Sequence, residues 1–184
     1  GGGNNISYCF NNTIVGGLTN KIYGDSDLNR ESNYGFIGGG QDNFISGDTP
    51  YGTIGGGYLN RINKDSNNGT IGGGSGNQIT ASTHSSILGG ITNYIWMNSN
   101  YSTIGGGTTN TLSNASVSSL IGGGEQNFLF ASDYATIGGG TYNVIKNASD
   151  ASTVGGGQAN ITYLTAFAGI GGGFTNLITS TASN

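Results

Sequence analysis

The densest group of charged residues in the chain lies between Tyr23 and Glu31, where the sequence reads Tyr-Gly-Asp-Ser-Asp-Leu-Asn-Arg-Glu. Asp25, Asp27 and Asn29 have the alternating spacing of the oxygen ligands in a calcium-binding loop, but the glycine and the glutamate that complete an EF-hand loop do not follow. Calcium binding is therefore one interpretation of this segment. A solvated loop and a loop that contacts a partner are the two others.

Aromatic side chains form a second set of candidate site residues. Four tyrosines recur at one position of a repeat, and two more aromatics lie close together at an expected turn. The recurring residues are Tyr34, Tyr51, Tyr101 and Tyr134, and Trp96 lies in the expected turn next to Tyr94. Exposed tyrosine and tryptophan side chains stack on sugars or anchor protein contacts. They also pack at corners or between chains, so a purely structural role is the alternative.

The sequence does not favour an enzyme. His84 and Cys9 are the only histidine and the only cysteine, which leaves one candidate base and argues against a zinc site. His84 falls at the recurring aromatic position, which predicts that it stacks with Tyr101 and its neighbours or faces water. No nucleophile elbow is present, and the glycine runs lack the Lys-Ser or Lys-Thr of a phosphate-binding loop. The nine acidic residues are spread through expected turns, whereas a glycosidase needs a carboxylate pair. We predict no catalytic site and, calcium aside, no cofactor.

Charge and composition exclude two classes of partner. The net charge is -4 with only five Lys and Arg residues, so the chain lacks the basic patch that nucleic-acid binding requires. No apolar stretch is long enough to insert into a membrane. Glycine accounts for 38 of the 184 residues and charged residues for only 8%. Because isoleucine, tyrosine and phenylalanine recur at regular intervals, this composition indicates regular β-structure rather than disorder.

The string Ile-Gly-Gly-Gly-x-x-Asn-x-Ile recurs along the chain with few changes. Aligned on its asparagine, the repeats are 16 or 17 residues apart, with one spacing of 23. The asparagines are Asn4, Asn20, Asn43, Asn60, Asn77, Asn93, Asn110, Asn127, Asn143, Asn160 and Asn176. The long spacing contains residues 23–31, which we interpret as a loop insertion. The switch between 16 and 17 falls after the second aliphatic residue, which predicts a turn that accepts one extra residue.

Each repeat has one aliphatic residue two positions after the asparagine and another six positions before it, with Thr162 as an exception. Large and small residues alternate with period two, as in Tyr51-Gly52-Thr53-Ile54, and the glycines would break any helix. The pattern predicts two short strands and two turns per repeat, stacked so that equivalent residues lie about 4.8 Å apart. Stacked asparagines are expected to form a hydrogen-bonded ladder and to occupy left-handed corners.

The predicted fold is an all-β parallel β-solenoid of about eleven rungs of 16–17 residues, with residues 1–184 as a single repeat array that begins and ends within a rung. Two aliphatic side chains per rung make a thin core. The three consecutive glycines leave a face without side chains, which can pack against the opposite wall or against another chain. We therefore expect a homo-oligomer and predict a trimer.

The segment from Ser132 to Asn143, Ser-Asp-Tyr-Ala-Thr-Ile-Gly-Gly-Gly-Thr-Tyr-Asn, resembles the head repeats of YadA-like trimeric autotransporter adhesins. It is also similar to Gly-Gly-Gly-x-x-Asn repeats in bacterial surface proteins and in fibre-like proteins of giant viruses. The resemblance covers nearly the whole chain and concerns a repeat, so it implies fold more strongly than function. It implies a left-handed β-roll of three chains, displayed at a surface and binding host receptors or matrix. The repeat here is longer than in that family, and the sequence shows no neck, coiled-coil stalk or membrane anchor.

Together these features predict an extracellular structural or adhesive fibre module at a cell or virion surface. Its expected partners are copies of itself and a host-surface glycan or matrix protein. The alternative is a passive shaft or filament subunit that has no ligand of its own. Ice binding would need an unbroken row of threonines, and Phe36, Leu120 and Gly169 interrupt the row.

Overall fold

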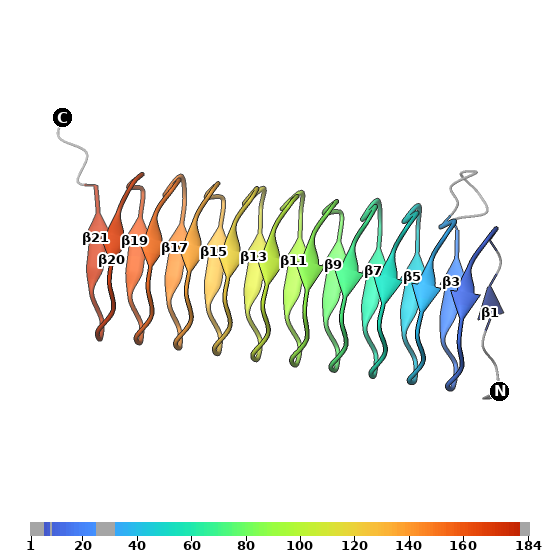
Figure 1. Cartoon of the computed structure of the whole chain (residues 1–184). Helices are drawn as coiled ribbons and strands as arrows, with labels where there is room; N and C mark the ends of the chain where they lie inside the picture. Colours follow the sequence, from blue (N-terminus) through green and yellow to red (C-terminus); the bar gives the residue numbers. More distant parts are fainter. Residues whose placement is uncertain (1–5, 8, 25–31, 181–184) are drawn as a thin grey trace.

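The structure is a computed structural model that describes residues 6–7, 9–24 and 32–180. Within these residues the chain forms strands, turns and bends without any helix, so none of its elements is a membrane-spanning helix. The strands stack in parallel in two sheets, one of 11 strands and one of 10, and build an elongated solenoid with β1 and β21 at opposite ends (Figure 1). The predicted all-β parallel β-solenoid is confirmed.

The two sheets take alternate strands of the chain. The 11-stranded sheet consists of β1 (Ile6–Ser7), β3 (Lys21–Tyr23), β5 (Phe44–Ser46), β7 (Arg61–Asn63), β9 (Gln78–Thr80), β11 (Tyr94–Trp96), β13 (Thr111–Ser113), β15 (Phe128–Phe130), β17 (Val144–Lys146), β19 (Ile161–Tyr163) and β21 (Leu177–Thr179). The 10-stranded sheet consists of β2 (Thr13–Ile14), β4 (Phe36–Ile37), β6 (Thr53–Ile54), β8 (Thr70–Ile71), β10 (Ser86–Ile87), β12 (Thr103–Ile104), β14 (Leu120–Ile121), β16 (Thr136–Ile137), β18 (Thr153–Val154) and β20 (Gly169–Ile170).

The core is made of the two aliphatic positions of each repeat. In strands β3 to β21 of the 11-stranded sheet the middle residue points inward, and Ile45, Ile62 and Ile79 are in direct register and fully buried. The two-residue strand β1 differs, because Ser7 and not Ile6 pairs with Ile22. The 10-stranded sheet contributes its second strand residue, for example Ile54 and Ile71, which are also fully buried. Because successive strand residues point to opposite faces, the neighbours of each core residue face away from the core.

The repeated asparagines form a buried ladder inside one corner. The Nδ2 group of Asn60 donates to the Gly56 carbonyl of its own rung at 2.9 Å and to the Gly74 carbonyl of the next rung at 3.0 Å. Its Oδ1 accepts the backbone N–H of Asn77 at 3.1 Å. The predicted ladder is therefore present. The left-handed residue at this corner is the one before the asparagine, such as Leu59 with φ 56°, and not the asparagine itself.

The turn after each strand of the 11-stranded sheet absorbs the difference between 16 and 17 residues. In the 17-residue rungs two consecutive residues have positive φ, as at Lys64 and Asp65, whereas the 16-residue rung that follows has one, Ala81. One added left-handed residue therefore lengthens the turn without shifting the register of the strands, as the spacing predicts. The 23-residue spacing falls in the same turn, and residues 25–31 of that insertion lie outside the described residues.

The three glycines of each run have different surroundings. At Gly74, φ is +89° and an added Cβ would lie 2.1 Å from the Gly90 carbonyl oxygen of the next rung. At Gly72 an added Cβ would lie 2.4 Å from the carbonyl oxygen of Leu88, the next rung's residue at the same position. At Gly73 no atom lies within 4 Å of such a Cβ, and φ is not positive. Close approach between rungs therefore explains the first and third glycines, and the second faces open space.

Candidate functional site

The recurring tyrosines lie in one column at a corner of the solenoid. Each residue of this column has a left-handed backbone, with φ between 54° and 62° at Tyr34, Tyr51, His84 and Tyr101. The left-handed turn directs the side chain away from the core, and Tyr34, Tyr51, Tyr101 and Tyr134 are 52%, 55%, 60% and 67% exposed. The structure therefore brings together four of the six predicted surface aromatics.

Stacking within this column limits what it can bind. Tyr34 and Tyr51 lie 5.1 Å apart with an interplanar angle of 6°, and His84 and Tyr101 lie 5.0 Å apart at 15°. The predicted stacking of His84 is thus confirmed, and its Nε2 also lies 3.3 Å from Asn68 Nδ2. Within each pair, one face of each ring is covered by the other ring. Because aromatic platforms bind sugars through a ring face, these pairs act first as a structural ladder.

The other two predicted aromatics lie elsewhere. We expected Trp96 in a turn, but Tyr94 and Trp96 are the first and third residues of strand β11. Both point outward from the 11-stranded sheet, since the middle residue Ile95 is buried. The expectation of a turn was wrong because this strand continues one residue beyond the buried aliphatic before the corner begins. Tyr94 and Trp96 therefore belong to a different surface from the corner tyrosines.

We define the outer face as the first and third residues of strands β3 to β21 of the 11-stranded sheet. Seven aromatic residues lie on it, namely Tyr23, Phe44, Tyr94, Trp96, Phe128, Phe130 and Tyr163. Neighbouring rings contact one another: Tyr23 meets Phe44 edge-on at 4.8 Å, and Phe128 stacks on Phe130 at 5.8 Å. Lys21, Arg61 and Lys146 are its charged residues, and the face holds no Asp or Glu. It is therefore aromatic and cationic on a chain of net charge -4.

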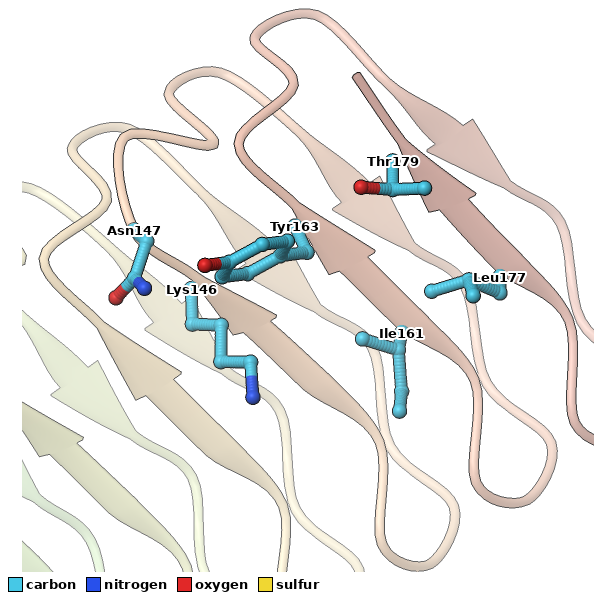
Figure 2. Close-up of a pocket in the computed structure, with 6 residues that line it drawn as sticks. All are labelled: Lys146, Asn147, Ile161, Tyr163, Leu177 and Thr179. Atoms are coloured by element: carbon cyan, nitrogen blue, oxygen red, sulfur yellow. The ribbon is translucent and has the colours of Figure 1, made fainter. Parts of the chain in front are cut away.

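A groove of about 370 Å³ lies on the outer face near its C-terminal end (Figure 2). It is lined by Lys146, Asn147, Ile161, Tyr163, Leu177 and Thr179. The Lys146 Nζ lies 5.4 Å from the centre of the Tyr163 ring, a cation–π distance. Ile161 and Leu177 supply apolar surface beside it, and Asn147 and Thr179 supply polar groups. The groove can therefore hold a ligand that combines an apolar ring face, hydroxyl groups and a negative charge.

A smaller groove of about 190 Å³ lies near the other end of the same face. It is lined by Thr19, Lys21, Asp42, Phe44, Leu59 and Arg61. Asp42 belongs to the adjoining corner, where its carboxylate accepts hydrogen bonds from the Thr19 hydroxyl and the Gln41 amide. Those bonds hold the carboxylate at the edge of the groove, with Lys21 and Arg61 on the sheet beside it.

The acidic residues do not gather into a metal site among the residues that the structure describes, where no group of three His, Cys, Asp or Glu residues could hold an ion. The calcium candidates Asp25, Asp27 and Asn29 lie outside the described residues. One acidic pair was not expected: Asp133 and Asp150 occupy the same position in adjacent rungs. Asp150 Oδ1 accepts the backbone N–H of Asp133 at 2.9 Å, and Asp133 Oδ1 accepts that of Val117 at 2.8 Å. Both carboxylates therefore secure corner backbone groups.

The outer face was missed by sequence reasoning except at Tyr94 and Trp96. Its residues lie one and three positions after the repeated asparagine, on either side of the buried aliphatic residue. Their types vary from rung to rung, whereas the asparagine and the aliphatic residue hardly vary. The signal that could have found the face is the period-two alternation itself, which assigns both positions to one outward surface.

Comparison with known proteins leaves the chain without an assigned family: no family model matches it, and no curated protein is significantly similar to it.

Proposed function

We propose that this chain is a structural and adhesive module of an extracellular fibre, displayed at a cell or virion surface, and that it binds rather than catalyses. The observation that carries this proposal is the elongated solenoid (Figure 1), whose stacked strands and corners hold exposed aromatic side chains in rows along its axis. Stacking of about 4.8 Å per rung extends the 11-stranded sheet over roughly 50 Å. A rigid scaffold of this kind suits attachment because many weak contacts along one rod reinforce each other.

The similarity of the repeat to YadA-like heads supports the same role, and we propose a left-handed homotrimer on that basis together with the glycine pattern. A Cβ added at the second glycine of the run would meet no atom closer than 3.9 Å in any described rung, and at Gly73, Gly89, Gly139 and Gly156 no positive φ requires glycine. A bare strip of backbone lets another chain approach closely. Leu88 and Ile91 flank Gly89 and are 61% and 53% exposed, which adds apolar surface beside the strip.

Light scattering on the purified chain tests the oligomer. The expected mass is three times that of the 18.6 kDa chain. Gly73→Gln places a side chain into the open space and should lower the mass towards that of one chain while the circular dichroism spectrum stays unchanged. Thr53→Gln, on the 10-stranded sheet away from the glycine strip, is the control. A monomeric wild-type chain, or a Gly73→Gln variant with unchanged mass, would contradict the proposed interface.

Binding to arrays of glycans and extracellular-matrix proteins tests the adhesive role. The proposal expects saturable binding that is retained by the isolated chain. A chain that binds no glycan or matrix protein would instead support the second candidate, a passive shaft. The stacked pairs Tyr34–Tyr51 and His84–Tyr101 favour that second candidate for the corner column, because one face of each ring is already covered by its partner.

A further inference from the structure

We propose that the outer face of the 11-stranded sheet binds an anionic polysaccharide that lies along the solenoid axis. This inference rests on the proposed adhesive function and names its ligand class and its surface.

Charge is segregated on this molecule. The described acidic residues are Asp42, Asp48, Asp65, Glu125, Asp133 and Asp150, and all lie outside the named strands. Three of the four described cations, Lys21, Arg61 and Lys146, lie on the outer face instead. Asp42 is the one described acid that lines a groove of this face, at its edge beside Lys21 and Arg61, and no acid lines the groove at Lys146. A chain of net charge -4 that collects three of its cations on one sheet face has a local field there that attracts anions.

The cation at the larger groove is available to a ligand. Lys146 is the only Lys or Arg that follows Lys64 in the sequence. In the described structure its ammonium group lies over the Tyr163 ring and has no carboxylate within salt-bridge distance. A ligand carboxylate or sulfate can pair with this ammonium group without first breaking an internal salt bridge, and such charge-assisted hydrogen bonds are the strong ones.

The surface between the cations suits sugar rings. Half-buried aromatic rings offer contact with the C–H faces of pyranoses, and Trp96 is 42% exposed near the centre of the face. Polar residues alternate with the aromatics. Gln78 donates to Thr80 at 2.9 Å and Thr80 to Asn63 at 2.7 Å. These two hydrogen bonds hold both amides in place, and neither uses Gln78 Oε1 or Asn63 Nδ2, which can bond to hydroxyl groups of a ligand.

The spacing along the face suits an extended chain rather than a single sugar. Two rung steps separate Lys21 from Arg61, and five separate Arg61 from Lys146. At about 4.8 Å per step these distances are roughly 10 Å and 24 Å. One rung is comparable in length to one residue of an extended polysaccharide, so successive sugars can meet successive rungs. Contacts that are individually weak then add up along one ligand.

Two other anionic partners fit less well. Three cations are few for a nucleic acid, whose binding depends on many phosphate contacts. An anionic membrane is bound by side chains that insert into it, whereas most aromatics of this face are half-buried and alternate with amides and hydroxyls. An anionic polysaccharide is the partner that uses the cationic, the aromatic and the polar residues of the face together.

The experiment uses Trp96, the only tryptophan of the chain, as a reporter within the face. The full chain is titrated with polygalacturonate, heparin and neutral dextran while Trp96 emission is recorded. We expect a saturable change with the two polyanions and none with dextran. Binding should weaken strongly between about 10 mM and about 1 M salt, where the Debye length falls from about 30 Å to about 3 Å.

Matched variants locate the charge contribution. Arg61→Gln combined with Lys146→Gln should weaken polyanion binding by about tenfold or more, whereas Lys64→Gln, which removes a cation from a turn, should change it by less than about twofold. The combination Arg61→Lys with Lys146→Arg should retain binding, and thermal melting verifies that each variant is folded.

Several results would overturn the inference. One is that dextran binds as well as the polyanions, and another is that Lys64→Gln weakens binding as much as the double variant Arg61→Gln, Lys146→Gln does. A third is a changed molecular mass of the double variant, which would make the face a contact between chains. Binding to phosphatidylglycerol vesicles but to no polysaccharide would assign the face to a membrane. Binding of other glycans or matrix proteins with no polyanion response would remove this inference and leave the adhesive role intact. No binding to any ligand would remove both.

Discussion

The backbone N–H of Asn77 donates to the side-chain Oδ1 of Asn60 at 3.1 Å, although the two residues are 17 positions apart in the sequence. Asn77 Nδ2 donates to the same oxygen at 3.2 Å and to the carbonyl oxygens of Gly73 and Gly90 at 3.0 and 2.9 Å. One buried side chain therefore joins three successive rungs. The same set of contacts recurs at Asn43, Asn93, Asn110, Asn127, Asn143 and Asn160.

Asn77→Ala should be strongly destabilising. It leaves the buried backbone N–H of Asn93, which donates to Asn77 Oδ1 at 3.0 Å, without its acceptor. An orphaned buried group costs about 1–3 kcal/mol, so we expect a loss of about 3 kcal/mol in the free energy of unfolding. Guanidinium denaturation of the variant and of the wild-type chain measures this loss in the free energy of unfolding. Gln158→Ala, which truncates an exposed side chain, is the control and should change the free energy by less than about 0.5 kcal/mol. Equal effects of the two substitutions would contradict the structural role of the ladder.

The glycine run from Gly72 to Gly74 predicts three different costs for substitution by alanine. Gly74→Ala should be the most damaging, because it forces alanine into φ +89° and brings its Cβ to 2.1 Å from a backbone oxygen. Gly72→Ala should cost less, since Val15 and Leu88 show that the position accepts a side chain. Gly73→Ala should change the free energy of unfolding of one chain by less than about 0.5 kcal/mol. Denaturation at a concentration where the chains are separate measures this order, and a Gly73→Ala cost equal to that of Gly74→Ala would contradict it.

Thr162→Val should be stabilising. Thr162 is fully buried in the column of Ile145 and Ile178, and its Oγ1 has no hydrogen-bond partner. Valine keeps the shape and removes the unsatisfied hydroxyl, which should raise the free energy of unfolding by about 1 kcal/mol or more. The melting temperature should rise accordingly. Thr153→Val on the exposed side of β18 is the control and should have little effect, and a destabilised Thr162→Val variant would mean that the hydroxyl has a partner in solution.

Asn67 and Asn100 occupy the same position in different rungs and should respond differently to alanine. Asn100 Oδ1 accepts the backbone N–H of Thr83 from the preceding rung at 2.7 Å. In the rung that precedes Asn67, the residue equivalent to Thr83 is Pro50, which has no N–H to donate. Asn67 Oδ1 is accordingly buried without a hydrogen-bond partner. Asn100→Ala should therefore cost about 1 kcal/mol, whereas Asn67→Ala should be neutral or stabilising. Denaturation midpoints of the two variants compare them directly, and the reverse order would exclude this explanation.

The periodicity of the sequence determined the fold. In a parallel stack each rung meets an equivalent rung, so a pattern that returns every 16 or 17 residues specifies both the strand register and the core, as Ile62 and Ile79 show. The asparagine ladder could be predicted for the same reason: an amide that recurs at one buried corner must find its partners in the rungs above and below.

Other features depended on the tertiary structure because they involve contacts between rungs or the direction of a side chain. The glycine run reads as three equal residues, and only the distance to the next rung separates Gly74 from Gly73. The corner tyrosines could be aligned, but their mutual stacking follows from the left-handed backbone at Tyr34 and Tyr51. Lys21, Arg61 and Lys146 lie one or three positions after a repeated asparagine, but their distances along one face follow only from the stacking of the strands. The sequence by itself thus determined what repeats, and the stacked structure decided what the variable positions form together.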